Sequence, residues 1–511
     1  MILIRPESVS DMDAYATQHR KTTEEALIRA AGEGVAKVIL AHYTGGEVLV
    51  LCGGGNNGAD GYATALSLAA AGVPVKAVDV LNKGQRSEGG RAVLAEYREK
   101  CGVPLSADAL FGTTRAAVIV DAVFGSGARG ALSEQARQVC EWMGRQAAFK
   151  VAVDIPLGVD ADYGCVQPVA LRVDLTVMLS LPKRGLFSYP AKEYCGELVM
   201  LPLGFDTEEM YARYGCAVAM DEAELLARLP RRTQNSHKGS YGKLYAFCGS
   251  HLYRGAPHLC ALGALRMGVG MVRLITEEAV IHTVGGKLPE LLFDPMSSIS
   301  AWSEAKMAKK AEEATDADAI LVGPGSGVSE GLYRFVRLLC AKEGAPLLLD
   351  ADALGAIARY APDVDAFFAE AARPLLLTPH PLEFARLIHA TAAEVQRDRM
   401  RLAVEYAKRW GVSLLLKGAG TVITDGEHLI LNTTGSSALS KGGSGDVLAG
   451  AVGALLCQGA SPIDALAVGA HLHGAAGDSL AAELSEYGVI PSDLPARMAS
   501  LLAKLLKASA I

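Results

Sequence analysis

Short apolar runs alternate with helical stretches along most of the chain, and this alternation constrains the fold more than any other feature. In the first half, the apolar runs predict strands at residues 48–51, 75–80, 117–121, 151–154 and 175–179, with helices at 61–71 and 134–146. The alternation then restarts, with predicted strands at residues 244–248, 271–275, 319–322, 346–350, 375–378 and 413–417, and long helices at 445–458 and 462–480. Strands separated by helices form parallel sheets with helices on both faces. We therefore expect an α/β protein with two three-layer domains.

The length and composition agree with two domains, because 511 residues exceed the size of one ordinary domain. Half of the residues are hydrophobic and 55 are glycine, a composition that supports large cores and tight turns. A charged, arginine-rich stretch at residues 221–232 lies between the two series of strands. We place the junction beside this stretch and expect domains at residues 1–218 and 219–511.

Charge and apolar patterning exclude several classes of partner. The chain has 49 Lys and Arg residues against 56 Asp and Glu residues, so its formal net charge of −7 leaves no basic excess to bind a nucleic acid. The opening residues lack the regions of a signal peptide, and no run of about 18 apolar residues predicts a membrane span. The ten cysteines are dispersed without a Cys-x-x-Cys pair, which favours free thiols in a reducing compartment. We expect a cytoplasmic homo-oligomer that binds small molecules, without nucleic-acid or membrane partners.

Residues 441–450 read Lys-Gly-Gly-Ser-Gly-Asp-Val-Leu-Ala-Gly, a glycine-rich turn that leads into an apolar helix. Unpaired backbone N–H groups at a helix start attract anions, and glycine allows a phosphate to come close. Gly443, Ser444 and Gly445 therefore predict an anion cradle. Asp446 has the same sign of charge as a phosphate, so it is better suited to act as a base on a hydroxyl group beside that phosphate. The alternative is an ordinary helix start with a capping aspartate.

A second glycine-rich loop, Cys-Gly-Gly-Gly-Asn-Asn-Gly-Ala-Asp-Gly at residues 52–61, joins a predicted strand to a helix. A glycine loop alone is weak evidence for a nucleotide site, but Asn56, Asn57 and Asp60 add groups that can hold a cation or a ribose. Asp121 and Asp154 end two further strands. Because the carboxyl ends of parallel strands meet at one crevice, we expect these side chains to face one pocket. The alternative is that each aspartate caps the helix that follows it.

Three motifs in this half, Gly-Gly-Gly-Asn-Asn-Gly-Ala-Asp-Gly, Asp-Ala-Val-Phe-Gly-Ser-Gly and Asp-Ile-Pro-Leu-Gly-Val-Asp, resemble the NAD(P)H-hydrate epimerase family. That family interconverts the R and S forms of NAD(P)H hydrated at C6 of the nicotinamide ring. The resemblance implies that Asp154 is a substrate contact and acid–base group, and that Asn57 and Asp121 bind a potassium ion together with position 157. The implied substrate-binding residues are Asn56, Asn57, Gly58, Ala59, Asp60, Gly125, Ser126, Gly127, Ala128, Arg129, Gly130, Ala131 and Asp154.

Two positions depart from the pattern of that family. The family usually has glycine where this chain has Ala59, which is a mild change. It usually has serine where this chain has Leu157, and it assigns that serine to the potassium shell. Leu157 can offer a backbone carbonyl oxygen to the ion but no hydroxyl. Potassium binding and the epimerase rate are therefore the two properties that this change affects.

Several segments of the second half suit a nucleotide site. Residues 236–243 precede its first strand, Arg-Gly-Ala-Pro at 254–257 opens a helix, and Val-Gly-Pro-Gly-Ser-Gly at 322–327 follows a strand. His380 lies between two prolines that fix a strand-end loop, where a structural and a functional role are both open. Lys417 ends a strand and leads into Gly-Ala-Gly-Thr, which suits the phosphates of an adenine nucleotide. With Asp446 as base, these parts suit phosphoryl transfer to a small hydroxyl compound.

These segments resemble the ADP-dependent NAD(P)H-hydrate dehydratase family, whose fold is of the ribokinase type, over nearly all of residues 236–480. The matching motifs occur in the expected order: Lys-Gly-x-x-Gly, Gly-Ala-Pro, Gly-Pro-Gly-x-Gly, Asp-Ala-Asp-Ala-Leu at 350–354, Thr-Pro-His-Pro, Lys-Gly-Ala-Gly-Thr and Gly-Gly-Ser-Gly-Asp. The resemblance implies that the hydrate contacts Ala256, Gly325 or Gly327, His380 and Asp446. It implies that the nucleotide is held by Lys417, Gly418, Ala419, Gly420, Thr421 and Gly445. Minor departures are Ser326, where the family often has leucine, and residues 432–437, where it more often has Gly-Asn-Pro-Gly.

Together the two halves resemble the bifunctional NAD(P)H-hydrate repair enzymes. We expect epimerisation in an N-terminal domain with a Rossmann-like parallel sheet, and dehydration of the S hydrate in a C-terminal domain with a ribokinase-like sheet. Asp446 would take the hydroxyl proton while a phosphoryl group transfers from ADP, and loss of phosphate would then restore NAD(P)H and leave AMP. ADP, Mg²⁺ and K⁺ are the expected cofactors. Two alternatives stay open: a small-alcohol kinase that forms a stable phosphate ester, and a first half that only binds nucleotide and is catalytically silent.

Overall fold

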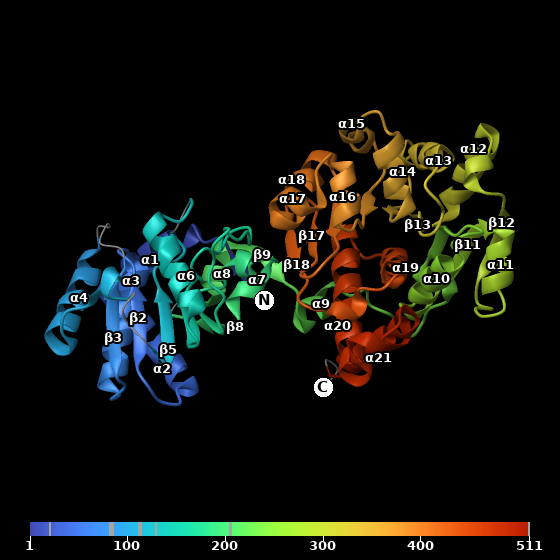
Figure 1. Ribbon diagram of the computed structural model, residues 1–511. Helices are drawn as coiled ribbons and strands as arrows, with labels where there is room; N and C mark the ends of the chain where they lie inside the picture. Colours follow the sequence, from blue (N-terminus) through green and yellow to red (C-terminus); the bar gives the residue numbers. More distant parts are fainter. Residues whose placement is uncertain (20–21, 81–85, 111–114, 128–129, 204–206, 509–511) are drawn as a thin grey trace. The chain divides into compact units, whose positions relative to one another are not determined.

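A computed structural model describes the chain except residues 20–21, 81–85, 111–114, 128–129, 204–206 and 509–511 (Figure 1). The chain divides into two compact units, Ile2–Ala217 and Val218–Ile511, and Met1 belongs to the second of them. We refer to these as the N-terminal unit and the C-terminal unit. Each unit has its own sheet and its own hydrophobic core.

The N-terminal unit is built on a seven-stranded sheet with the order β4-β3-β2-β5-β6-β7-β8, in which all neighbours are parallel. The chain starts in the middle of this sheet with β2, moves outward through β3 and β4, and returns to the other side of β2 with β5. This is a Rossmann-like topology with a switch point between β2 and β5. The strands are β2 (Val48–Cys52), β3 (Val75–Asp79), β4 (Leu105–Ser106), β5 (Val118–Ala122), β6 (Phe149–Val153), β7 (Leu175–Leu179) and β8 (Glu197–Leu201).

Helices cover both faces of this sheet because its central strands are apolar on both sides. Val48 and Val50 of β2 pack in the cluster formed with α2, α3 and α4, whereas Leu49 and Leu51 pack in the cluster formed with α6. The helices are α1 (Ser8–His19), α2 (Glu24–His42), α3 (Asn56–Ala70), α4 (Glu88–Cys101), α5 (Ala107–Leu110), α6 (Glu134–Arg145), α7 (Lys192–Cys195) and α8 (Thr207–Tyr214), with a 3₁₀ turn at Arg184–Phe187 and a short strand β1 at Ile2–Ile4. The unit is therefore a three-layer α/β structure.

The C-terminal unit has a longer sheet with the order β9-β18-β17-β16-β15-β14-β13-β10-β11-β12. The neighbours from β16 to β12 are parallel, whereas β17 is antiparallel to both β16 and β18. The strands are β9 (Gly215–Ala219), β10 (Lys243–Phe247), β11 (Met271–Glu277), β12 (Leu292–Met296), β13 (Ala319–Val322), β14 (Leu347–Leu349), β15 (Leu375–Leu377), β16 (Ser413–Leu416), β17 (Val422–Thr424) and β18 (Leu429–Leu431).

Helices also cover both faces of the second sheet. One face carries α10, α19, α20 and α21, which share a core with Leu244, Leu321 and Leu348. On the other face, Phe335 of α13 contacts Phe247 of β10, with ring centroids 4.9 Å apart. The helices are α9 (Glu222–Arg228), α10 (Gly255–Arg266), α11 (Glu278–Val284), α12 (Glu304–Glu313), α13 (Glu330–Cys340), α14 (Asp352–Tyr360), α15 (Val364–Ala369), α16 (Pro381–Leu387), α17 (Ala392–Arg397), α18 (Arg399–Trp410), α19 (Ser444–Cys457), α20 (Pro462–Gly488) and α21 (Leu494–Ala508). The predicted fold class of two three-layer α/β domains is confirmed.

The predicted strands are all present, and the differences lie at their ends and between them. The helix predicted at residues 61–71 begins earlier, at Asn56, so the asparagines of the glycine loop belong to its first turn. The strand predicted at 151–154 ends at Val153, which leaves Asp154 just beyond it. The short antiparallel strands β17 and β18 were not predicted, because three apolar residues carry too little pattern to be recognised.

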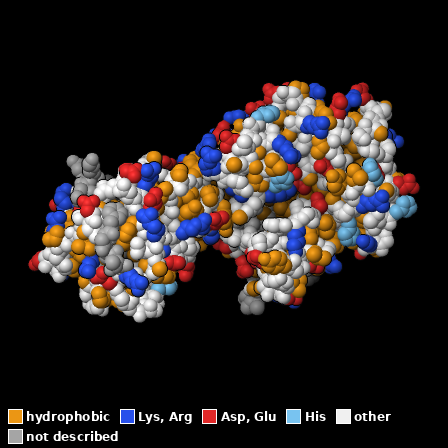
Figure 2. Space-filling model, viewed as in Figure 1, with side chains coloured by type: hydrophobic (Ala, Val, Ile, Leu, Met, Phe, Trp, Pro, Cys, Tyr) orange, Lys and Arg blue, Asp and Glu red, His pale blue; other side chains and the backbone are white. Residues whose placement is uncertain are grey.

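The surface carries charges of both signs. Acidic and basic side chains intermingle on the visible face of each unit (Figure 2), as the formal net charge of −7 leads one to expect. None of the helices in the described part of the chain combines the length and the apolar character that a membrane-spanning helix needs.

Candidate active sites

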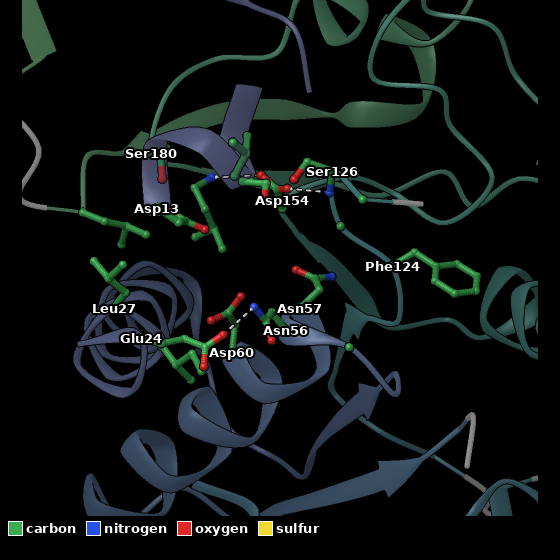
Figure 3. A pocket seen from close by; sticks show the side chains of 18 of the residues that line it. Asp13, Glu24, Leu27, Asn56, Asn57, Asp60, Phe124, Ser126, Asp154 and Ser180 are labelled. Atoms are coloured by element: carbon green, nitrogen blue, oxygen red, sulfur yellow. Dashed lines mark hydrogen bonds between the residues drawn. The ribbon is translucent and has the colours of Figure 1, made fainter. Parts of the chain in front are cut away.

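A pocket of about 830 Å³ lies in the N-terminal unit at the topological switch point (Figure 3). The loops after β2 and β5 line it with residues 54–57 and 123–127, and Asp154 and Ser180 follow the ends of β6 and β7. Helices α1 and α2 supply further lining residues, among them Asp13 and Glu24. The carboxyl ends of the parallel strands thus converge on one cavity, which is where a Rossmann-like sheet binds its ligands.

The glycine loop after β2 needs its glycines because two stretches of backbone touch there. A side chain at Gly53 would place its Cβ atom 1.9 Å from the carbonyl oxygen of Val123, and one at Gly58 would lie 1.9 Å from the carbonyl oxygen of Gly53. Ala59 is fully buried inside α3, and its methyl group faces Gly90 of α4. The alanine at this position is therefore accommodated by helix packing.

The Asp154 carboxylate is held by three donors. Its Oδ2 atom accepts a hydrogen bond from the Ser126 backbone at 3.1 Å, and its Oδ1 atom accepts one from the Leu179 backbone at 3.2 Å. Oδ1 also forms a hydrogen-bonded ion pair with Lys183. The Lys183 side chain is completely buried and also donates to the Leu179 carbonyl at 2.6 Å. Asp154 has a φ of 70°, a left-handed conformation that is rare outside glycine and that occurs at functional sites. It therefore ties together the segments that follow β5, β6 and β7.

Lys183 was not predicted from the sequence. It lies in a loop of mixed composition after β7, and its only local signal is the apolar residues on its N-terminal side, Leu181 and Pro182. Its pairing with Asp154 is a tertiary contact across 29 positions of the chain. Asp13 was also missed, because α1 carries no recognisable motif.

The remaining predicted epimerase residues fall into three groups. Gly125, Ser126 and Gly127 line the main pocket with Asn56, Asn57 and Asp60. Gly130 and Ala131 line an adjoining pocket of about 360 Å³. Gly58 and Ala59 are buried in α3 behind the lining residues. Ala128 and Arg129 lie outside the described residues.

In the C-terminal unit, five parallel strands direct their carboxyl ends to one region. The strands are β10, β13, β14, β15 and β16, which are consecutive neighbours in the sheet. The loop after β13 closes on the start of α10, because a Cβ atom at Gly325 would lie 3.0 Å from the Cβ atom of Ala256. Gly325 and Gly327 both have positive φ, and the Gly327 backbone donates to Asp352 Oδ2 at 2.8 Å. Two predicted hydrate contacts, Ala256 and Gly325, are therefore brought together.

The predicted cradle begins α19, where Gly443 precedes the helix with a φ of 105° and Asp446 lies in the first turn. Lys417 follows β16 and lies against the cradle, since a Cβ atom at Gly445 would be 3.2 Å from Lys417 Nζ. Lys417 Nζ also donates at 2.5 Å to Asp350, a buried carboxylate that accepts a second hydrogen bond from Thr378 Oγ1 at 2.8 Å. The lysine, the cradle and the aspartate of the Asp-Ala-Asp motif thus form one cluster.

Asp446 has the electrostatic environment of a base. Burial and the neighbouring Asp350 carboxylate raise its pKa to about 7, against the opposing charge of Lys417. Among the residues that the structure describes, no hydrogen bond or ion pair occupies its carboxylate. A carboxyl group with a pKa near neutrality can both accept and return a proton at physiological pH.

His380 caps α16 through its side chain. Its Nδ1 atom accepts hydrogen bonds from the backbones of Leu382 at 3.1 Å and Glu383 at 3.3 Å, and Nε2 lies 3.4 Å from Glu383 Oε1. Burial and Lys417 lower its pKa, so the imidazole is neutral at pH 7. His380 therefore has a structural role as the N-terminal cap of α16. Because its ring is half-exposed, the Nε2 atom can also contact a ligand.

The predicted nucleotide loop is shaped by Arg399 beneath it. Arg399 donates to the Lys417 carbonyl at 3.1 Å, and a Cβ atom at Gly418 would lie 2.1 Å from its Nη1 atom. Thr421 Oγ1 donates to the Gly418 carbonyl at 2.9 Å, which closes the turn over Ala419 and Gly420. Ala419 and Gly418 are exposed, so the outer face of the turn is open to a ligand.

Comparison with known proteins identifies both units. The family model described as NAD(P)H-hydrate dehydratase matches residues 244–499, and the one described as YjeF-related protein N-terminus matches residues 24–185. The bifunctional NAD(P)H-hydrate repair enzyme Nnr of Moorella thermoacetica is 33% identical over 513 residues, covering 97% of this chain and 95% of its own length. The chain belongs to the bifunctional NAD(P)H-hydrate repair enzyme family.

Other members of the family are similar to the chain over comparable lengths. The Nnr enzyme of Escherichia coli is 33% identical over 503 residues, which cover 96% of this chain and 93% of that protein. Among solved structures, the ADP/ATP-dependent NAD(P)H-hydrate dehydratase of Bacillus subtilis, co-crystallised with ATP and Mg²⁺, is 32% identical with a TM-score of 0.50. It covers 57% of this chain and 99% of its own chain. A ribokinase-like superfamily protein of Enterococcus faecalis, 22% identical with a TM-score of 0.50, shares the fold.

The residues predicted to bind potassium do not form a ready cation shell. Asp121 is buried, and its oxygens accept hydrogen bonds from the Leu157 backbone at 2.7 Å and the Val123 backbone at 3.2 Å. The Leu157 side chain packs in an apolar cluster, and its carbonyl oxygen accepts a hydrogen bond from Leu171. Asn57 donates through Nδ2 to the Val153 carbonyl at 3.1 Å, and among the described residues no hydrogen bond reaches its Oδ1 atom. Potassium stays a prediction from the family resemblance, and we derive no step from it.

Proposed function

We propose that the C-terminal unit dehydrates the S form of hydrated NAD(P)H with ADP, and that the N-terminal unit interconverts the R and S forms. The observation that carries the first assignment is Asp446, a carboxyl group with a raised pKa in the first turn of α19, directly after the cradle residue Gly445 that lies against Lys417. Membership of the bifunctional family supports both activities in one chain. The division of labour makes both epimers of the damaged cofactor repairable.

The dehydratase step starts with proton transfer to Asp446. The Asp446 carboxylate takes the proton of the C6 hydroxyl. At the same time, the hydroxyl oxygen of the hydrate attacks the terminal phosphorus of ADP, and AMP leaves. Backbone N–H groups of Gly443 and Gly445 stabilise the charge on the moving phosphoryl group, whereas that of Ser444 already donates to the Lys441 carbonyl at 3.2 Å. Lys417 holds the phosphates of the nucleotide. Cleavage of the C6–O bond then releases phosphate, and loss of a proton from C5 restores the ring double bond. The products are NAD(P)H, AMP and phosphate.

Mg²⁺ fits this site as a partner of the nucleotide. The described residues contain no group of three or more His, Cys, Asp or Glu side chains that could hold a metal ion by themselves. Mg²⁺ commonly binds one or two carboxylates together with water and substrate phosphates. Asp352 would serve as such a carboxylate, since only its Oδ2 atom is engaged among the described residues. When bound, the ion would neutralise charge on the phosphates.

In the N-terminal unit we propose that the hydrate occupies the pocket of about 830 Å³ over β2 and β5. Asp154 contacts the substrate there as a carboxylate that Lys183 and two backbone donors hold in place. The family resemblance implies an acid–base role for Asp154 as well, and that role stays a prediction. Its three donors fix the position of the side chain, so the role that we propose for it is binding and positioning.

The test uses the purified protein with a mixture of hydrate epimers, with and without ADP, and follows the absorbance of reduced nicotinamide. Complete recovery of NAD(P)H in the presence of ADP is the expected result, with AMP and free phosphate as products. Recovery that stops partway would show that the N-terminal unit does not epimerise. A stable phosphate ester in place of NAD(P)H would show that the C-terminal unit is a kinase.

The cellular location and assembly extend this proposal. All ten cysteines are free thiols in the described structure, which supports a reducing compartment such as the cytoplasm. The homo-oligomer remains a prediction, which sedimentation of the purified chain would test.

A further inference from the structure

Asp60 is a buried carboxylate that the mechanism so far leaves without a role. It lies in the first turns of α3, is 8% exposed, and lines the N-terminal pocket. Figure 3 shows its side chain directed into the cavity. Among the described residues, no hydrogen bond or ion pair satisfies this carboxyl group. A buried charge without a partner is costly, so the group must be protonated, or a ligand must supply the partner.

Asp13 reaches the same cavity from another wall. It lies on α1, which precedes the part of the chain matched by the N-terminal family model at residues 24–185. Figure 3 shows the carboxyl groups of Asp13 and Asp60 facing the cavity from different helices. Within the described residues, Asp13 too has no hydrogen bond or ion pair to its side chain. The pocket therefore has a carboxyl group with free oxygens on each of two walls.

Burial and neighbouring carboxylates raise the pKa of both groups. Burial raises the pKa of Asp13 to about 6, with Asp154 and Glu24 adding to the shift and Lys183 opposing it. Burial likewise raises the pKa of Asp60 well above its usual value, and Asp154, Asp13 and Glu24 act in the same direction. Asp154 differs from both, because Lys183 is in direct contact with it.

Opening the ring at a carbon that carries a hydroxyl group and is bonded to the ring nitrogen needs one proton removed from the hydroxyl and one delivered to N1. We propose that Asp60 and Asp13 are the two proton-transfer groups of the epimerase, one serving the C6 hydroxyl and the other N1 of the bound hydrate. This inference rests on the proposed epimerase function of the N-terminal unit. It assigns catalytic roles to Asp60, previously implied only as a binding residue, and to Asp13.

The chemistry is a reversible ring opening without any redox change. One carboxylate removes the proton of the C6 hydroxyl, the C6–O bond becomes a carbonyl double bond, and the C6–N1 electron pair leaves with N1. The other carboxylic acid gives its proton to N1. Rotation about the C5–C6 bond presents the opposite face of the aldehyde, and the reverse steps close the ring with the inverted configuration. During closure N1 gives its proton back to the second group and attacks the aldehyde carbon, and the oxygen regains its proton from the first group, so both carboxyl groups end the turnover in their starting protonation states.

The experiment measures interconversion of the R and S hydrates by chromatography, without ADP, using the full chain. Asp60→Asn and Asp13→Asn should each lower the epimerisation rate by about 10²–10⁴-fold, the usual contribution of a general acid or base. Matched controls on the same helices are Ser67→Ala on α3 and Asp11→Asn on α1, neither of which lines the pocket. Both controls should epimerise at the rate of the parent, and ADP-dependent repair of the S form should be unchanged in all four variants.

The pH profile of the parent provides a second measurement that needs no variant. One acid and one base give a bell-shaped dependence of the rate on pH, and each Asp→Asn variant should lose one limb of the bell in its residual activity. Epimerisation by Asp60→Asn or Asp13→Asn within threefold of the parent, or a flat parent profile, would overturn the inference. A parent protein that does not interconvert the epimers would instead reject the epimerase assignment, and the inference with it.

Discussion

The two units place an aspartate at the centre of each candidate site, and the surroundings of the two side chains are opposite. Asp154 is held in place by hydrogen bonds from Lys183 and from the backbones of Ser126 and Leu179. Asp446 is close to Lys417 and Asp350 but has no direct donor among the described residues, and burial raises its pKa to about 7. An aspartate at the end of a strand or the start of a helix is thus not a base by position alone. Its direct donors decide whether the side chain is held in place or keeps its oxygens open to a ligand.

The largest expected effect would come from Asp446→Asn. The amide keeps the shape of the side chain but cannot accept the hydroxyl proton, so repair of the S hydrate should fall by about 10²–10⁴-fold. ADP binding, measured by calorimetry, should stay within a few-fold of the parent because Lys417 and the cradle are unchanged. Turnover within a few-fold of the parent would place the base elsewhere.

Asp154→Ala tests the other side of the comparison. Removing the carboxylate leaves Lys183 buried without a counter-charge, and breaking a buried pair costs about 3–5 kcal/mol. Hydrogen exchange should show weakened protection in the N-terminal unit, and epimerisation should be lost while S-hydrate repair persists. The double variant Asp154→Leu with Lys183→Met should recover much of the stability but none of the epimerase activity. If Asp154→Ala left hydrogen-exchange protection of the N-terminal unit unchanged, the stabilising role of the buried Asp154–Lys183 pair would be contradicted.

Lys417→Ala should weaken nucleotide binding more than it affects the base. Loss of a charge-assisted hydrogen bond costs about 1.5–3 kcal/mol, which is a rise of roughly 10–100-fold in the ADP dissociation constant. The matched control is Lys408→Ala, an exposed lysine on α18. Calorimetry that gave the same constant for parent, control and variant would remove Lys417 from the phosphate site.

Ala59→Gly should have the smallest effect, because it only restores the residue usual in the family. The site lies inside α3, where glycine in place of alanine costs about 0.5–1 kcal/mol. A small loss of thermal stability with epimerisation within twofold of the parent is expected. A large gain in the epimerase rate would show that the methyl group of Ala59 distorts the loop.

The sheets and the positions of the sites could be predicted because their causes are local. Apolar runs such as Leu175–Leu179 and Ala319–Val322 coincide with the strands as predicted. Since parallel strands bring their carboxyl ends together, the residues after them were expected to share a crevice. The pocket at the end of β2 and β5, lined by Asn56, Asn57 and Asp60, agrees with that expectation.

The partners of the site residues could not be predicted because they depend on tertiary contacts. Nothing local to Lys183 or Asp13 connects either residue with Asp154 or the pocket, and both lie outside the quoted motifs. The positive φ of Asp154 is likewise a property of the folded chain. The sequence therefore indicated several residues that line the sites, and the structure shows which side chains contact one another there.

The pH dependence of S-hydrate repair at saturating ADP tests the central claim most directly. Asp446 acts as a base only when ionised, so kcat should fall as the pH drops below its raised pKa of about 7 and should level off above it. The fall should approach about tenfold for each pH unit, and Asp446→Asn should abolish this dependence along with the activity. A flat profile through neutral pH, or one unchanged in Asp446→Asn, would contradict the assignment of Asp446 as the base.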